Sequence, residues 1–210
     1  MKPEAIRAEP IVLSDIQRDC YQEIANVAMG QAADLLARLL NVFVELPIPQ
    51  VNLFEITDLH MALQSLDQEE AASAVCQGFA GDGITGEALI IFNDSNFDDI
   101  ARLMNYTGEH SEAMHVELLM DVANILIGAF LKGLAEQLDL AFSQGHPAVL
   151  GQHKPIRDLL RPTHQSWHQT LAIEIIYALE NHPVNCDLLL LFTEDSIEVM
   201  NKKIAYLLED

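Results

Sequence analysis

Two segments of the sequence carry a carboxylate followed, three positions later, by an asparagine: Glu23–Asn26 (EIAN) and Asp121–Asn124 (DVAN). In each segment a glycine follows four positions after the asparagine, at Gly30 and Gly128. Residues three and four positions apart lie one above the other on a helix, so acid, amide and glycine share one face. A carboxylate binds a cationic side chain, and an amide can both accept from and donate to a water molecule. The pattern is therefore suited to placing a water beside a bound cation.

These segments belong to a longer internal repeat. The stretch from Glu23 aligns with the stretch from Asp121 at a distance of 98 positions, and the stretch from Glu87 aligns with the stretch from Asp187 at a distance of 100 positions. Both alignments occur in the same order along the chain, which indicates a duplication. We therefore predict a single domain, residues 1–210, made of two repeated halves at about 14–110 and 111–208.

Two long helices must carry the acid–amide segments. Ser14 with Gln17 fits a capping box at the start of the first helix, which we expect to end near Asn41 before two prolines. We expect the second helix to run from Ser111 or His115 to about Asp139. In the first helix, apolar residues at helical spacing predict a buried stripe of Ile16, Cys20, Ile24, Val27, Leu35 and Leu39.

Strands are predicted where β-branched and apolar residues run between turn signals. These runs are Val51–Ile56, Ala74–Phe79, Glu87–Phe92, Val149–Gln152, Leu171–Ala178 and Asp187–Phe192. Gly81, Gly83 and Gly86 favour a hairpin turn in the first half, and residues 181–183 mark the equivalent place in the second. The acidic turns after Phe92 and Phe192 each precede an amphipathic helix. The sequence thus predicts an α/β class, with helix, strands and short helix occurring twice.

Composition excludes several functional classes. Lys and Arg number 11 against 32 Asp and Glu, a formal net charge of −21. Such a surface repels nucleic-acid phosphates and anionic lipids, so we expect neither nucleic-acid nor membrane binding. Cys20, Cys76 and Cys186 have no CxxC spacing and are expected to be free thiols. The first ten residues lack the apolar core of a secretion signal, so we expect a cytoplasmic protein.

The duplicated acid–amide helix resembles the CheC/CheX/FliY family of bacterial chemotaxis proteins, whose members carry an ExxN motif on a long helix, often once in each half. Glu23–Asn26 with Gly30 is similar to the motif in full, whereas Asp121–Asn124 has aspartate in place of glutamate. The resemblance covers about residues 14–208. It implies a two-layer α/β domain with internal pseudo-twofold symmetry, in which two long helices lie on one face of an antiparallel sheet.

The resemblance also implies an activity: hydrolysis of the aspartyl phosphate of a CheY-type response regulator, which attenuates a chemotaxis or other two-component signal. Asn26 and Asn124 would orient the attacking water, much as a glutamine does in GTPases. Glu23 and Asp121 would pair with a lysine of the regulator. The regulator brings its own Mg²⁺, so we expect no cofactor or metal held by this chain. CheD is an open further partner.

Several alternatives stay open at this point. A polar helical face such as that of Asp19 and Glu117 is commonly just solvated, and Gly30 and Gly128 could serve helix packing instead of a partner's approach. The chain could be a non-catalytic adaptor for a response regulator, for CheD or for a flagellar switch component, or a sensor that binds a regulator without dephosphorylating it. His146, His153, His164 and His168 are interpreted as loop histidines, and Trp167 as an anchor.

Overall fold

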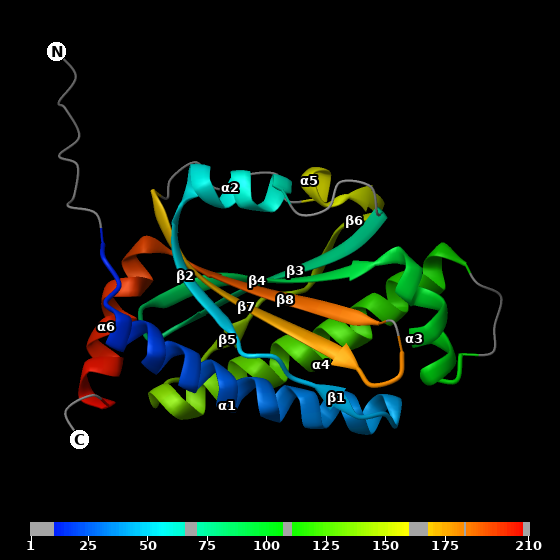
Figure 1. Ribbon diagram of the computed structural model, residues 1–210, viewed down its shortest axis with the longest axis horizontal. Coiled ribbons are helices and arrows are strands. Elements are labelled where there is room, and N and C mark those ends of the chain that lie inside the picture. Colours follow the sequence, from blue (N-terminus) through cyan, green and yellow to red (C-terminus); the bar gives the residue numbers. More distant parts are fainter. Residues whose placement is uncertain (1–10, 66–70, 107–110, 160–167, 183, 208–210) are drawn as a thin grey trace, which may run out of the picture.

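The computed structural model of the chain describes residues 11–65, 71–106, 111–159, 168–182 and 184–207 (Figure 1). The same succession of helix, two strands, helix, two strands and helix occurs twice. The helices are α1 (Asp15–Leu40), α2 (Ile56–Ser65), the 3-10 turn η1 (Asp94–Asn96), α3 (Phe97–Leu103), α4 (Glu112–Leu138), α5 (Ile156–Leu159) and α6 (Glu194–Leu207). The strands are β1 (Val44–Glu45), β2 (Gln50–Glu55), β3 (Ala71–Gly81), β4 (Ile84–Asn93), β5 (Ser143–Gln144), β6 (Ala148–Pro155), β7 (Gln169–Leu179) and β8 (Asn185–Phe192).

All strands join one antiparallel sheet in the order β1-β7-β8-β4-β3-β5, with β2 also on β7 and β6 also on β3. Each half therefore pairs its first strands with the other half. At the centre, β4 pairs with β8 so that Leu89 faces Leu189, its own counterpart in the repeat. The predicted α/β class with an antiparallel sheet is confirmed. The division into two repeated halves agrees with this order and stays an inference.

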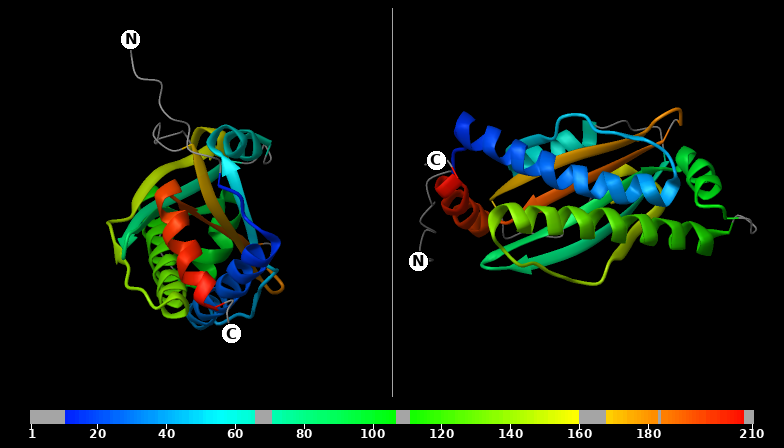
Figure 2. Two further views of the ribbon diagram at one scale, coloured as in Figure 1. Left: turned by 90° about the vertical axis from the view of Figure 1, so that its left-hand side faces the viewer. Right: turned by 90° about the horizontal axis from the view of Figure 1, so that it is seen from below.

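The two long helices lie side by side and antiparallel on one face of the sheet, as Figures 1 and 2 show. On the other face lie α2 and α5, which the sequence patterns did not predict. They cover one end of that face and form a partial third layer, in addition to the sheet and the two long helices. All six predicted strands are present, each slightly longer or shifted at its ends, and β1 and β5 are additional short strands.

Matching caps set the lengths of the long helices. Ser14 forms the predicted capping box with Gln17, and the Ser111 side chain accepts from the backbone N–H of Met114, so the second helix begins at Ser111 and not at His115. At the other ends, Asn41 and Asp139 adopt the left-handed conformation, with φ of 54° and 51°. Such a residue ends a helix by satisfying its last carbonyl groups. The hairpin turn at Asp82–Gly83 is confirmed, with positive φ at both residues.

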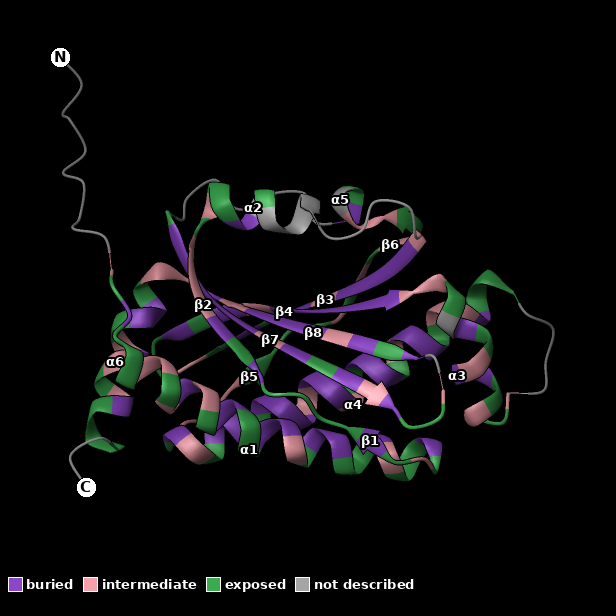
Figure 3. Cartoon of the chain, in the orientation of Figure 1, coloured by how far each residue is buried: buried purple, intermediate pink, exposed green. Residues whose placement is uncertain are grey.

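The predicted buried stripe of α1 is largely wrong. Ile24 is buried, but Ile16 is 66% exposed, and Val27, Leu35 and Leu39 are also exposed (Figure 3). The face that packs on the sheet and on α4 combines four alanines with five larger residues: Ala25, Ala28, Ala32 and Ala33 with Tyr21, Ile24, Met29, Leu36 and Leu40. Alanines at helical spacing give only a weak apolar signal in the sequence, because the alanine side chain is weakly hydrophobic. The exposed larger residues are consequently available to a partner.

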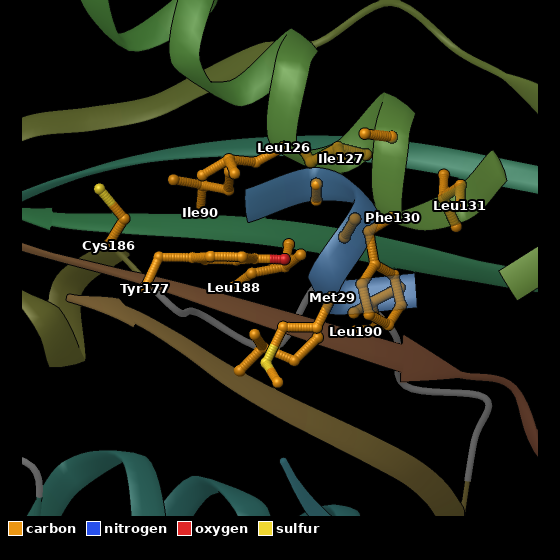
Figure 4. Packing of buried hydrophobic residues seen from close by; sticks show 14 of the residues in the cluster. Met29, Ile90, Leu126, Ile127, Phe130, Leu131, Tyr177, Cys186, Leu188 and Leu190 are labelled. Carbon is orange, nitrogen blue, oxygen red and sulfur yellow. The ribbon is translucent and has the colours of Figure 1, made fainter. Parts of the chain in front are cut away.

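Close contact between α1 and α4 depends on Gly133. A Cβ atom placed there would lie 2.8 Å from the Cα of Ala28. Beneath this crossing, Met29, Phe130, Leu188 and Leu190 pack together in the main core (Figure 4). Although α4 is long and apolar enough to cross a membrane, 67% of its most apolar window is buried inside the protein. Its hydropathy is thus explained by its position in the core.

The opposite face of the sheet holds a half-buried carboxylate. Asp187 on β8 and Glu174 on β7 lie diagonally across adjacent strands, since Glu174 pairs with Leu189 and Asp187 with Ile176. Burial and the neighbouring Glu174 carboxylate raise the pKa of Asp187 from its ordinary value of 3.8 to about 6. Cys186 beside it is buried in the main core; all three cysteines are free, as expected.

The first prediction concerns the helix crossing. Gly133→Ala should lower the free energy of unfolding by about 1–3 kcal/mol, because the added methyl meets backbone and forces the helices apart. Gly128→Ala, on the same helix, is the matched control: its Cβ would meet only the Gln144 side chain at 3.8 Å. That change should raise the free energy by about 0.5–1 kcal/mol through helix propensity. Urea unfolding measures the free energy of unfolding of both variants. Equal changes in the two would contradict a close contact between α1 and α4 at Gly133.

The second prediction follows from the raised pKa of Asp187. The folded state holds the proton more tightly than the unfolded chain, so stability falls as pH rises from about 4 to about 6. Asp187→Asn removes this loss and should raise the free energy of unfolding at pH 7.5 by about 1–3 kcal/mol, with a smaller gain at pH 5. Urea unfolding across this pH range is the measurement. Glu198→Gln, an exposed change on α6, is the control, and an identical pH profile for both variants would refute the assignment.

Candidate functional site

The four predicted site residues lie on the surface of the two long helices. Glu23 and Asn26 are exposed on α1, and Asp121 and Asn124 are exposed on α4. Among the described residues, Glu23, Asn26 and Asn124 have no side-chain hydrogen bond or ion pair within the protein. Each acid stands one helical turn before its amide, so both side chains can reach the same group of a partner. We name the Glu23/Asn26 pair the first half-site and the Asp121/Asn124 pair the second half-site.

The two half-sites open on opposite flanks of the helix pair. Asn26 precedes Ala28 by two residues and Asn124 precedes Gly133 by nine, so each asparagine points roughly 160–180° away from the helix contact. Because the helices are antiparallel (Figure 2), the two asparagines are separated by about 16 Å along the helix axes. Both asparagines are exposed, and they face away from each other across the helix pair.

Open space surrounds both glycines of the pattern. A Cβ at Gly30 would meet nothing within 4 Å, and one at Gly128 would meet only the Gln144 side chain. The alternative in which these glycines permit helix packing is therefore wrong, and Gly133 has that role instead. Behind them, Ala33 and Ala135 are buried. The open space at Gly30 and Gly128 leaves room for another protein's backbone to approach each helix.

Different segments border the two half-sites. Next to the first, the Gln22 side chain donates to the carbonyl of Pro49 at 3.0 Å, which fixes the segment leading into β2. Next to the second lies β5 with Gln144. We name Leu39, Phe43, Leu46 and Ile48 the apolar run; all four are exposed, with Phe43 at 67% and Ile48 at 75%. Their counterparts in the repeat are Gln137, Ala141, Gln144 and His146. Only the first half thus carries exposed large apolar residues at these positions.

The acids also differ in their surroundings. In the first half-site Asp19 and Glu23 are exposed on successive turns. In the second, partial burial and the carboxylates of Glu117 and Asp121 together raise the pKa of the Tyr106 hydroxyl. The sequence patterns did not single out Tyr106. The signal that would have found it is the repeat itself, since Tyr206 occupies the corresponding position in the second half.

Of the histidines that were interpreted as loop residues, His146 and His168 lie outside helices and strands, whereas His153 lies on β6. His153 has a φ of 53° and contacts the Asp94 carboxylate at 2.8 Å, and Asp94 also accepts from the Ser73 hydroxyl at 3.0 Å. His115 stacks on Phe97, with ring centroids 4.8 Å apart. His164 and Trp167 lie outside the described residues. In the parts of the chain that are described, no three His, Cys, Asp or Glu side chains are arranged to hold a metal ion.

A shallow depression of about 450 Å³ lies elsewhere, on the sheet at the end of the β3–β4 hairpin. Its lining includes Gly78, Thr85, Glu87 and Thr193. Gly78 alternates with the core residue Phe79 along β3, so the depression is on the face opposite the long helices. Neither asparagine contributes to it. The half-sites are consequently surface sites, which fits a protein partner better than a small molecule.

Comparison with known proteins identifies the fold. No family model matches the sequence. FliY from Thermotoga maritima is similar in structure, with a TM-score of 0.69 at 18% identity over 93% of this chain and 99% of that one. The FliM middle domain from H. pylori has a TM-score of 0.63 at 14% identity, covering 91% and 99%.

A smaller relative in structure is the chemotaxis protein CheX from Desulfovibrio desulfuricans. Its TM-score is 0.56 at 16% identity, and the match covers 80% of this chain and 99% of that chain. All three comparisons span most of the described sheet and helices. The paired long helices on an antiparallel sheet, with strands exchanged between halves, are therefore the fold of the CheC/CheX/FliY proteins.

Proposed function

We propose that this protein is a phosphatase that removes the phosphoryl group from the aspartyl phosphate of a CheY-type response regulator. One observation carries the proposal: two exposed acid–amide pairs stand at equivalent places on the two long helices. Glu23, Asn26 and Asn124 make no side-chain contacts of their own among the described residues. Polar groups that are neither buried nor paired contribute little to the fold, so their arrangement is better explained by a partner.

The amide would act on the water. An acyl phosphate is already reactive, and the chief requirement is a water held in line with the phosphorus. Asn26 and Asn124 can accept a hydrogen bond from that water through the amide oxygen and donate through the nitrogen. An amide is too weak a base to take the proton, so the gain in rate comes from positioning.

The acid would fix the orientation of the regulator. A lysine ammonium of the receiver domain pairs with Glu23 or Asp121, one turn before the amide, and this contact sets the register of the two proteins. The receiver contributes its own Mg²⁺ as part of the substrate. The open floor at Gly30 and Gly128 lets the phosphorylated loop approach the helix closely. Such signalling partners place the protein in the cytoplasm.

The third prediction tests this function. Asn26→Ala combined with Asn124→Ala should lower the rate of dephosphorylation by about 10²–10³-fold, because a group that positions the attacking water is lost. The measurement is phosphate release from CheY-type receiver domains phosphorylated with acetyl phosphate. Receiver binding, followed with beryllofluoride-activated receivers, should change little.

Controls for this experiment come from the same helices. Gln137→Ala removes a half-buried amide of α4 outside both half-sites and should leave the rate unchanged. Glu23→Lys should instead weaken binding, since like charges would meet at the lysine contact. Full activity in the double asparagine variant would refute the proposed phosphatase function. The chain would then be an adaptor or a sensor that binds a regulator without dephosphorylating it.

The apolar run favours a second candidate, a non-catalytic adaptor for a response regulator, CheD or a flagellar switch component. Large apolar side chains that are 67–75% exposed, such as Phe43 and Ile48, are characteristic of protein interfaces. A FliM middle domain shares the fold, and another structure of this fold shows FliM in a complex with SpeE. An adaptor needs this surface and has no need of the asparagines. A sensor would bind the receiver through the acids and leave the phosphate in place.

The fourth prediction separates the adaptor from the phosphatase. Phe43→Ser with Ile48→Ser should weaken receiver binding about tenfold or more, since two exposed apolar contacts are lost, and should leave the melting temperature nearly unchanged. For the phosphatase, the dephosphorylation rate at saturating receiver stays close to that of the parent protein. For the adaptor, no dephosphorylation occurs in either protein. Leu150→Ser, an exposed leucine on β6, is the control and should not affect binding.

A further inference from the structure

One turn beyond the glycine of each half-site lies an ion pair within the same helix. On α1, Arg38 contacts Asp34 through two nitrogens, with Nη2 at 2.9 Å from Oδ2 and Nε at 3.1 Å from Oδ1. On α4, the Nζ of Lys132 lies 3.8 Å from Oε1 of Glu136. All four side chains are between 50% and 75% exposed. We name Asp34–Arg38 the first ion pair and Lys132–Glu136 the second ion pair.

The two ion pairs occupy equivalent positions in the repeat but have opposite orders of charge. Asp34 corresponds to Lys132 at the distance of 98 positions, and Arg38 corresponds to Glu136. The acid, the amide and the glycine of the pattern each keep their type in both halves. The negative charge therefore lies nearer the amide in the first half-site, and the positive charge lies nearer the amide in the second.

Helix stability does not account for the second ion pair. An acid that precedes a base by four residues stabilises a helix better than the reverse order, and the second ion pair has the reverse order. Its Glu136 also accepts a hydrogen bond from the side-chain nitrogen of Gln31 on α1, at 3.2 Å. The 3.8 Å contact of Lys132 is longer than a charge-assisted hydrogen bond, so the ammonium retains donors for a partner's carboxylate.

A partner that uses a half-site must also cover the near charge of its ion pair. Asp34 lies eight residues after Asn26, about 12 Å along the helix axis, and within about 20° of Glu23 around that axis. Lys132 has the same relation to the second half-site. A protein interface of standard size covers about 800 Å² on each side, which corresponds to a disc of about 16 Å radius. A receiver centred on an asparagine therefore reaches the near charge.

We infer that Asp34 and Lys132 determine which response regulators each half-site accepts. The inference rests on the proposed function, in which a receiver docks its lysine on the acid and its phosphoryl group beside the amide. The shared spacing gives this docking the same orientation on both helices, so one patch of the receiver faces Asp34 in the first half-site and Lys132 in the second. Charge complementarity favours a basic patch in the first case and an acidic patch in the second. The two half-sites thus suit receivers of opposite local charge.

Reversal of an ion pair isolates this role. Asp34→Lys with Arg38→Glu gives the first half-site the charge order of the second, and Lys132→Asp with Glu136→Arg does the opposite. Each reversal leaves the formal net charge unchanged and retains an acid and a base four residues apart. All four positions are exposed, so the reversals should leave the fold intact.

The first arm of the test measures the binding of a panel of beryllofluoride-activated CheY-type receivers at about 50 mM salt. Asp121→Lys blocks the second half-site while the first ion pair is reversed, and Glu23→Lys blocks the first half-site while the second ion pair is reversed. For a given receiver, the two reversals should change Kd by about threefold or more in opposite directions. Both changes should shrink at about 0.5 M salt, because exposed charges are screened. Glu55→Lys with Lys154→Glu reverses two exposed charges on β2 and β6, and this control should leave Kd unchanged.

The second arm measures dephosphorylation of the same receivers after treatment with acetyl phosphate. In an Asn124→Ala background only the first half-site can act, and in an Asn26→Ala background only the second can. Reversal of the ion pair in the active half-site should change KM in the direction of the binding change. It should leave kcat close to that of the background, because the near charge lies about 12 Å from the amide. A fall in kcat would overturn the inference, since it would show that the ion pair positions the reacting groups.

The remaining outcomes separate the inference from the proposed function. Changes of Kd in the same direction, or no change, in a protein that binds the receivers would overturn the inference and leave the phosphatase intact. Absence of dephosphorylation in the unaltered protein would instead refute the phosphatase, and the binding arm would then decide whether the ion pairs select partners. Absence of binding to every receiver in the panel would refute both.

Discussion

Each half of the chain completes its sheet with strands of the other half: β2 pairs with β7, and β6 pairs with β3. The central β4–β8 ladder then joins the halves at Leu89 and Leu189. Neither half retains a full set of backbone partners without the other, so the halves fold as one unit. This exchange also brings α1 and α4 onto the same sheet face in antiparallel orientation. The position of both half-sites follows from that orientation.

Packing and function make opposite demands on the two long helices. The inner surface of α1 includes four alanines, and Gly133 of α4 lets the helices approach closely at one of them, Ala28. A close, smooth contact leaves the outer flanks free for polar residues. α4 buries more of its circumference than α1 does, and its exposed strip contains Glu117, Asp121 and Asn124, followed by Lys132 and Glu136 towards its C-terminal end. A strip of this width suits recognition through a few side chains.

The two half-sites share a backbone plan but differ chemically. Among the described residues, the two acids of the first half, Asp19 and Glu23, have no hydrogen bond or ion pair. The second half-site has a shorter acid, Asp121, and no large apolar residue at the positions that correspond to the apolar run. In a duplicated protein, one copy of a site can change while the other retains the activity. The first half-site is the one whose residues match the full pattern.

The sequence by itself determined the α/β class, the two long helices with their caps, the six longer strands and the acid–amide pairs, because each depends on residues close together in the chain. Spacings of three and four place Glu23 and Asn26 on one face in any helix. It did not determine which face of α1 is buried. The alanines of the buried face give little apolar signal, and the larger apolar residues of the exposed face give a stronger one. Only the tertiary structure decided the strand exchange, the opposite directions of the half-sites and the close contact of the long helices at Gly133. These depend on residues far apart in sequence or on how two helices rotate against each other, and a local pattern carries no information about either.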